Sequence, residues 1–306
     1  MFNDQSSENL KQRLNNKLKN NFTTEFQPNC ILTCPTDIGV QLNGGRLGSR
    51  YAPKCILNKL GNFTSNNKNK IYIQEIVSST QLSTFEELQI NQFKQIKSSI
   101  KSDPNKIIQI GGGHDNIYPL LKWLDHTGYK EITVINIDAH CDTRQDRVNH
   151  SGTPFRQFAR EYKGKLKVIQ YGINSYANDN QTLDQLENDQ EMQIIPIETV
   201  KTAKETQGVP GLLNLIRMSL RKTESELIVL SLDLDAIDSS NFEAVSAVNP
   251  YGMLKEDVVN IIHWYTQEAV SKIKVIGLYE YNPIYDNLSG SGALFTAKLV
   301  EQFLRE

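Results

Sequence analysis

The chain has 306 residues, of which 39% are hydrophobic and 22% are charged, and its formal net charge is −2 at pH 7. This length and hydrophobic content allow a large buried core, and the near-neutral charge gives no reason to expect nucleic acid or an anionic membrane as a partner. No run of about 18 consecutive apolar residues predicts a membrane span, and the first residues lack the basic and apolar regions of a signal peptide. We therefore expect a cytoplasmic protein with a small-molecule substrate.

The first segment of the chain differs in composition from the rest. Residues 1–26 are rich in Asn, Lys and Gln, and Leu10, Leu14 and Leu18 have a helical i, i+4 spacing. We interpret this segment as an amino-terminal extension that is either a short helix or a frayed end. Because no linker rich in Pro, Gly or Ser follows, we predict a single domain over residues 27–306.

Apolar runs alternate with helical segments along the rest of the chain. The predicted strands cover residues 107–110, 132–137, 167–171, 227–232 and 273–279. The predicted helices cover residues 85–101, 118–125, 153–163, 211–221 and 256–269. This alternation predicts an α/β fold with a mostly parallel sheet and helices on both faces, in which functional residues gather at the carboxyl ends of the strands.

Three candidate metal ligands follow the second of these strands. Asp138, His140 and Asp142 are two residues apart, and alternate side chains of an extended backbone share a face, so the three can converge beyond the strand end. Cys141 should point to the opposite face, and we interpret it as a packing residue rather than a ligand. The four cysteines form no Cys-x-x-Cys pair, so we expect free thiols rather than a zinc knuckle.

Two further strands end in residues of the same kind. His114 follows a run of three glycines, and Asp233 and Asp235 repeat the two-residue spacing. Carboxylates gathered in a packed core repel one another, and a bound cation would remove that repulsion. A mainly carboxylate donor set with two imidazoles suits Mn²⁺ better than it suits thiolate-loving ions or tetrahedral zinc.

Three motifs carry a resemblance to a known family: Gly-Gly-Gly-His-Asp at 111–115, Asp-Ala-His-Cys-Asp at 138–142, and Ser-Leu-Asp-Leu-Asp-Ala-Ile-Asp at 231–238. In type and order they resemble the arginase/agmatinase/formimidoylglutamase family, the ureohydrolases, over about Asp37 to Leu304. The resemblance implies a three-layer αβα fold, two Mn²⁺ ions per subunit and a homo-oligomer, a trimer or hexamer. It implies one ion on His114, Asp138, Asp142 and Asp233, and a second ion on His140, Asp235 and the bridging Asp138 and Asp233.

The chemistry that such a pair of ions supplies is hydrolytic. Ions roughly 3.5 Å apart can share a water and lower its pKa, which creates a hydroxide nucleophile. In this interpretation Asp142 is both a ligand and a catalytic residue. Asp238 is a candidate for orienting a ligand or the hydroxide, although the family has Asp-Pro here and this chain has Asp238-Ser239.

Within the family, the substrate-binding segments are most similar to those of formimidoylglutamases. Arg144 stands where formimidoylglutamases carry Arg and arginases carry Asn, and a guanidinium reads a carboxylate through two hydrogen bonds. The alternative is a surface arginine paired with Asp146 or another acidic residue. His150 is either a proton-transfer residue or an exposed loop histidine, and the following Ser151 and Arg156 are candidate substrate-binding residues.

Three other segments supply candidate substrate contacts. Asn43 lies in a glycine-rich loop, and Ser246 and Asn249 lie in a loop that resembles the Val-Ser-Ala loop of formimidoylglutamases. Glu280 matches the family's Glu-x-Asn-Pro motif. As a carboxylate it can pair with a cationic amidine and hold the reacting carbon, or it can form a salt bridge beneath the pocket.

The resemblance therefore implies a Mn²⁺-dependent formimidoylglutamase that hydrolyses N-formimidoyl-L-glutamate to L-glutamate and formamide, a step of histidine degradation. One alternative is a ureohydrolase for a guanidino compound such as agmatine, arginine or guanidinobutyrate. Another is a non-catalytic binding protein, because His150 is displaced by one residue from the family position and Pro is absent after Asp238.

Overall fold

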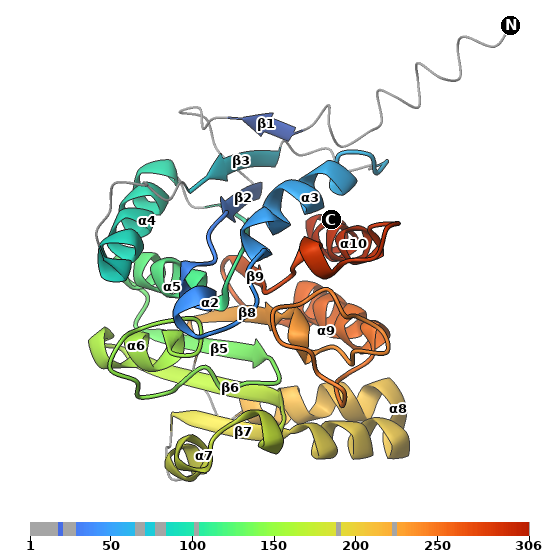
Figure 1. Ribbon diagram of the computed structural model, residues 1–306. Helices are drawn as coiled ribbons and strands as arrows, with labels where there is room; N and C mark the ends of the chain where they lie inside the picture. Colours follow the sequence, from blue (N-terminus) through green and yellow to red (C-terminus); the bar gives the residue numbers. More distant parts are fainter. Residues whose placement is uncertain are drawn as a thin grey trace, which may run out of the picture.

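The computed structural model describes residues 18–20, 29–64, 71–76, 84–100, 104–187, 191–221 and 225–305. Its centre is a sheet of nine parallel strands in the order β1-β3-β2-β4-β9-β8-β5-β6-β7 (Figure 1). The strands are β1 (Leu18–Asn20), β2 (Asn29–Cys34), β3 (Ile71–Glu75), β4 (Lys106–Gly111), β5 (Glu131–Ile137), β6 (Lys165–Ile173), β7 (Met192–Pro196), β8 (Leu227–Asp233) and β9 (Lys274–Tyr279).

Helices cover both faces of this sheet (Figure 1). One face carries α4 (Phe85–Ser99), α5 (Ile117–His126), α6 (Pro154–Glu161) and α7 (Asn180–Glu187). The other carries α3 (Ala52–Leu60), α8 (Ile197–Leu220), α9 (Lys255–Glu268) and α10 (Ser291–Leu304). A separate hydrophobic core lies under each helical layer. The predicted three-layer α/β fold is confirmed.

The central strands, β2, β4, β9, β8, β5 and β6, are buried on both faces over most of their length, and this explains their composition. All seven residues of β8 are buried, and runs of Ile, Val and Leu with no polar alternation are typical of such strands. All five predicted strands and all five predicted helices are present. The sequence-based prediction had missed β2, β3 and β7, which mix apolar residues with Asn, Thr or Gln.

Two helix boundaries show how local sequence sets the elements. The helix α4 begins with a capping box, in which Thr84 accepts a hydrogen bond from the Glu87 amide at 3.1 Å and Glu87 accepts one from the Thr84 amide at 3.3 Å. The helix α8 is broken at Gly208, where φ is 65° and ψ is −155°, two residues before Pro210. The predicted helix at 211–221 is therefore only its second half.

The amino-terminal prediction is only partly covered by the structure. Leu18 begins the edge strand β1, which pairs with β3, so a helix through this residue is wrong. Residues 1–17 and 21–28, including Leu10 and Leu14, lie outside the described residues. No helix in the described ranges has both the length and the apolar character needed to span a bilayer.

Strand register brings the loops that follow four central strands to one edge of the sheet. β4, β9, β8 and β5 are neighbours in that order, and Ile110, Leu278, Leu232 and Ile137 lie opposite one another across them. The residues after these positions therefore leave the sheet at the same level. Short elements at this edge are α2 (Ile38–Leu42), η2 (Ser49–Tyr51), η3 (His114–Asn116), η4 (Ser175–Ala177), η5 (Leu234–Ala236) and η6 (Pro283–Tyr285).

Candidate metal centre and substrate cavity

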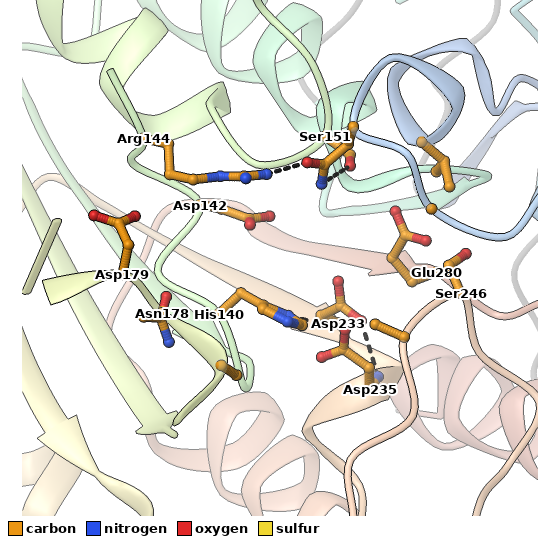
Figure 2. Close-up of a pocket in the computed structure, with 15 residues that line it drawn as sticks. His140, Asp142, Arg144, Ser151, Asn178, Asp179, Asp233, Asp235, Ser246 and Glu280 are labelled. Carbon is orange, nitrogen blue, oxygen red and sulfur yellow. Dashed lines mark hydrogen bonds and ion pairs between the residues drawn. The ribbon is translucent and has the colours of Figure 1, made fainter. Parts of the chain in front are cut away.

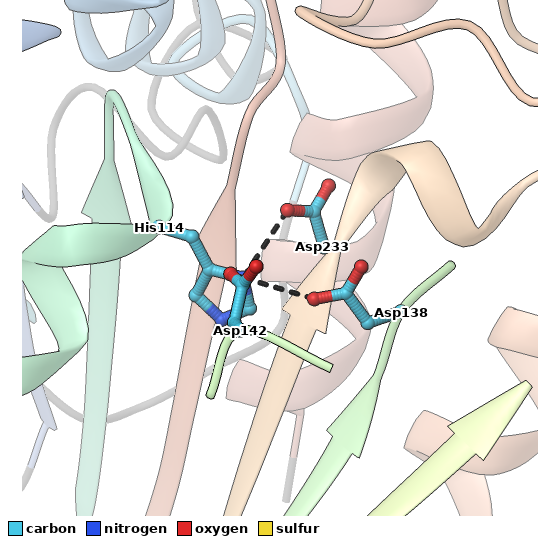
Figure 3. Close-up of side chains that lie close together, drawn as sticks. All are labelled: His114, Asp138, Asp142 and Asp233. Atoms are coloured by element: carbon cyan, nitrogen blue, oxygen red, sulfur yellow. Dashed lines mark hydrogen bonds and ion pairs between the residues drawn. The ribbon is translucent and has the colours of Figure 1, made fainter. Parts of the chain in front are cut away.

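The first group of candidate ligands surrounds the imidazole of His114 (Figure 3). Its Nδ1 lies 3.2 Å from Asp138 Oδ2, 3.0 Å from Asp142 Oδ2 and 3.2 Å from Asp233 Oδ2. All four side chains are buried, and their ligand atoms are close enough together to hold one ion. Three separate strand ends, those of β4, β5 and β8, supply them.

The second group lies beside the first and shares Asp138. His140 Nδ1 is 3.5 Å from Asp138 Oδ1 and 3.1 Å from Asp235 Oδ2. Asp138 therefore turns one oxygen to each group, as a bridging ligand would. Asp233, predicted as a second bridge, joins only the first group in the structure, because its Oδ1 accepts the N–H of Asp235 at 2.8 Å.

The electrostatics of the two groups favour a cation. Burial raises the pKa of Asp233 well above its ordinary value, and the neighbouring carboxylates of Asp235 and Asp138 add to the effect. Burial likewise raises the pKa of Asp235 to about 6. Although burial opposes it, hydrogen bonds from His114 and His140 hold the pKa of Asp138 below its usual range. Ionised together, these carboxylates repel one another, and a divalent cation would remove the repulsion.

The donor set fits a hard divalent ion. The two groups offer four carboxylates and two imidazole nitrogens, and no thiol is among them. Cys141 is fully buried in the hydrophobic core that also contains Phe155 and Phe158 of α6. Burial raises the pKa of its thiol, which agrees with its interpretation as a packing residue. Oxygen-rich sites with imidazole suit Mn²⁺.

Neighbouring side chains hold the ligands in orientation. Ser231 Oγ lies 2.7 Å from His114 Nε2, which leaves Nδ1 to face the carboxylates. The Nδ2 of Asn136 donates to Asp138 Oδ2 at 3.2 Å. Sequence reasoning had assigned no role to either residue, although Ser231 opens one of the three motifs.

Backbone strain is concentrated at the same place. Among the described residues, Asp142 and Glu280 are the two non-glycine residues with positive φ, at 51° and 62°. Such conformations cost roughly 1–3 kcal/mol each and persist where the surroundings enforce them, often at functional sites. Here they turn two carboxyl groups toward one cavity.

That cavity has a volume of about 300 Å³ and opens above the two ligand groups. Figure 2 shows Arg144 and Asp179 on one side, Glu280 and Ser246 on the other, and the candidate ligands between them. The predicted site residues that line it are Asn43, His140, Asp142, Arg144, Ser151, Asp233, Asp235, Ser246 and Glu280.

Arg144 combines both interpretations proposed for it. Its guanidinium lines the cavity and donates to the side chain of Asn43, which in turn donates to Ser151 Oγ at 2.9 Å. It also lies 3.8 Å from Asp146. With 38% of the side chain exposed, the guanidinium stays accessible from the cavity.

Glu280 presents an unused carboxyl oxygen. Its Oε1 accepts the N–H of His114 at 2.9 Å, whereas among the described residues the buried Oε2 has no partner at full hydrogen-bond geometry, although the nearby Ser246 hydroxyl acts to lower the pKa of the carboxyl. Burial raises the pKa of this carboxyl to about 8. No cation within the described residues pairs with it, so the predicted alternative, a salt bridge beneath the pocket, is not formed there.

Two of the predicted residues that follow β5 do not line the cavity: His150 in the loop and Arg156 in the first turn of α6. His150 is neither exposed nor in the cavity: its Nδ1 accepts the N–H of Gly152 at 3.0 Å and its Nε2 lies 2.7 Å from Asp146 Oδ2. Arg156 donates to the carbonyl of Thr143 at 3.3 Å. In this structure both residues shape the loop that carries Arg144.

Asp238 and Asn249 also lie outside the cavity lining. Asp238 accepts hydrogen bonds from Ser240 and from the Gly252 amide, and its carboxyl touches no candidate ligand. Asn249 donates to the carbonyl of Asp235 at 2.9 Å. Asp238 therefore shapes its own loop, and Asn249 supports a ligand through the backbone.

Two polar residues of the cavity were missed from the sequence. Asn178 and Asp179 follow β6, a strand that the sequence predicted, but they lie several residues beyond its end. The strand prediction alone therefore did not identify them. Asp179 accepts hydrogen bonds from the amide and hydroxyl of Thr182, which together with nearby Arg144 hold its pKa below the usual range. The cavity wall thus carries one positive and one negative group close together.

A three-layer αβα fold with two His/Asp groups at the tips of three parallel strands, β4, β8 and β5, defines an α/β protein with a candidate two-metal site. The chain belongs to the arginase family, whose family model matches residues 28–305. The resemblance inferred from the three motifs is confirmed.

Similar proteins of known name agree with this assignment. The chain is 27% identical to a formimidoylglutamase of Klebsiella pneumoniae, covering 89% of this chain and 83% of that protein. It is 28% identical to one of Hahella chejuensis, covering 84% and 78%. Its fold matches that of formimidoylglutamase from Bacillus subtilis with a TM-score of 0.81 at 18% identity, over 96% of this chain and 91% of that one. The match to Trypanosoma cruzi formiminoglutamase with Mn2+2 has a TM-score of 0.77 at 20% identity, over 91% and 92%.

Proposed function

We propose that this protein is a metal-dependent hydrolase that cleaves N-formimidoyl-L-glutamate to L-glutamate and formamide. The observation that carries the proposal is one cavity whose lining includes Arg144 and members of both ligand groups, namely Asp142 and Asp233 of the first and His140 and Asp235 of the second. Several similar proteins are named formimidoylglutamase, which supports the same substrate.

In this proposal two Mn²⁺ ions occupy the two ligand groups and share Asp138. Bound there, they would supply a hydroxide for attack on the formimidoyl carbon. The similar structure of Trypanosoma cruzi formiminoglutamase is a complex with Mn2+2, and the carboxylate and imidazole donors of this chain suit the same ion.

The unpaired carboxyl oxygen of Glu280 can bind the amidine group of the substrate. An amidine binds readily as a cation, and an N–H of that cation can donate to the unpaired Oε2. Pairing with a positive charge would lower the pKa of Glu280 and keep it ionised. Glu280 would then hold the amidine end across the ligands from Arg144 (Figure 2).

The opposite end of the cavity suits a carboxylate. N-formimidoyl-L-glutamate carries two carboxylates outside its amidine group, and the wall offers the guanidinium of Arg144. A cationic tail such as that of agmatine would meet Arg144 with like charge. The charge of Arg144 therefore favours the dicarboxylate over a guanidino amine.

As part of the same proposal, the reaction is a step of histidine degradation and the protein acts in the cytoplasm. All four cysteines are free in the structure, which agrees with a reducing compartment.

Comparing substrates on the Mn²⁺-loaded protein tests the proposal. We expect kcat/KM for N-formimidoyl-L-glutamate to exceed that for agmatine, arginine and guanidinobutyrate, and a chelator to abolish the reaction until Mn²⁺ is returned. Equal or better turnover of agmatine would refute the substrate. Mn²⁺ binding without hydrolysis of any of the four would favour the non-catalytic alternative.

A further inference from the structure

The imidazole of His114 is held between two aromatic rings. The ring of Tyr279 stacks on it with centroids 4.7 Å apart and planes 21° apart, and Phe155 meets it edge-on with centroids 5.6 Å apart. Tyr279 is fully buried at the end of β9 and does not line the cavity. Its contact with the site is therefore through the ligand His114.

Two strand glycines make the space for the Tyr279 ring. A Cβ on Gly277 would lie 2.2 Å from the Tyr279 hydroxyl oxygen, and a Cβ on Gly111 would lie 2.5 Å from Cδ1 of the same ring. Both distances are too short for any other residue. Glycine weakens a strand interior, so its presence in two neighbouring strands marks a close approach that the fold depends on.

The hydroxyl of Tyr279 is anchored on the adjacent strand. It donates to Gln109 Oε1 at 2.5 Å, and Gln109 Nε2 reaches Cys34 Sγ at 3.3 Å. Gln109 lies directly opposite Gly277 in the register of β4 and β9. The Tyr279 ring is thus held by three contacts: the hydrogen bond of its hydroxyl, the space left by Gly111 and Gly277, and the stack on the His114 imidazole.

This anchor belongs to a buried polar row one pleat below the ligands. Ser231 lies opposite Gly277 on the other side, Asn136 opposite Ser231, and Gln170 opposite Asn136. These polar side chains have no exposed surface. Ser231 contacts the His114 ring, and Asn136 bonds to Asp138 and Gln170. Apart from the unpaired Oδ1 of Asn136, the side-chain polar atoms of this row are held by such contacts, which favour one fixed arrangement.

We propose that Tyr279 is a positioning residue that fixes the plane of the His114 imidazole and so aims its Nδ1 at the ion of the first ligand group. The inference rests on the metal site of the proposed function. Its consequence is selective, because Tyr279 contacts no member of the second group's own pair, His140 and Asp235.

Stepwise Mn²⁺ binding to the full chain tests the inference, with calorimetry or manganese electron paramagnetic resonance counting each ion. Partners that orient a metal-ligating histidine typically contribute a factor of about 10–100 in metal affinity. For Tyr279→Leu we expect the Kd of one Mn²⁺ to rise by about tenfold or more, and that of the other to stay unchanged. Tyr279→Phe keeps the stack and loses only the anchor, so its Kd should lie between those of the wild type and the Leu variant.

Tyr265 of α9 provides a matched control. It too is fully buried, stacks on an aromatic ring, that of Phe303 at 6.2 Å, and donates its hydroxyl to the carbonyl of Ile228. Because both substitutions remove a buried ring, Tyr265→Leu and Tyr279→Leu should both lower the melting temperature, but Tyr265→Leu should leave both Mn²⁺ affinities unchanged.

Three results would overturn the inference: unchanged Mn²⁺ binding in both Tyr279 variants, equal weakening of the two ions, or the same loss in Tyr265→Leu. A wild-type chain that binds no Mn²⁺ would instead refute the proposed function, and this inference with it.

Discussion

Replacing Arg144 by Ala tests whether its guanidinium binds a carboxylate of the substrate. A hydrogen bond to a charged group contributes about 1.5–3 kcal/mol, and the 38% exposure of this side chain places the effect at the lower end. A loss of about 1.5 kcal/mol corresponds to a rise of about tenfold in KM for N-formimidoyl-L-glutamate. Arg144 touches no candidate ligand, so Mn²⁺ content should not change.

The assay is steady-state hydrolysis with Mn²⁺ content measured on the same samples. Arg144→Lys keeps the charge but loses the planar fork, and its KM should fall between those of the wild type and the Ala variant. Arg217, an ion-paired arginine of α8 with 30% exposure, provides the matched control, and Arg217→Ala should leave KM unchanged. Loss of Mn²⁺ from Arg144→Ala, or an equal rise in KM for agmatine, would refute the reasoning.

Two further predictions concern the buried carboxyl groups. Glu280→Gln keeps an acceptor for the His114 amide but removes the charge that faces the amidine, so kcat/KM should fall by about 100-fold with Mn²⁺ retained. Glu301→Gln, at a buried glutamate paired with Lys298, should not change kcat/KM, and a loss of activity there would contradict the assignment. Burial raises the pKa of Glu280 to about 8 from an ordinary 4.5, and that of Asp115 to about 7 from 3.8. Folded chains then hold protons that unfolded chains release, so in chelator the free energy of unfolding should fall as pH rises from about 5 to about 8. Thermal melts across this range measure it, and stability that rises with pH would contradict the prediction.

The convergence of the candidate metal ligands could be predicted from the sequence because they alternate along an extended backbone directly after buried strands. Asp138, His140 and Asp142 alternate beyond a strand whose apolar run is unbroken, and Asp233 and Asp235 repeat the pattern. The strands themselves are detectable because parallel strands buried on both faces are continuously apolar. The strand β2 was not predicted, because its buried Asn29 and Thr33 leave too short an apolar run.

Contacts that depend on loop conformation could not be predicted. His150 was a candidate proton-transfer residue although it is displaced by one residue from the family position, and in the structure its ring bonds within its own loop to Gly152 and Asp146. Asp179 enters the cavity from a loop after β6 that no periodicity describes. The role inferred for Tyr279 requires strand register, because only register places Gly277 between Gln109 and Ser231.

Counting Mn²⁺ ions per chain in the wild type and in Asp138→Ala tests the central claim most directly. Asp138 is the one carboxylate that both ligand groups share in the structure. We expect two ions in the wild type and the loss of both tight sites in the variant, while Asp235→Ala should lose only one. An Asp138→Ala protein that still binds two ions tightly would contradict the account.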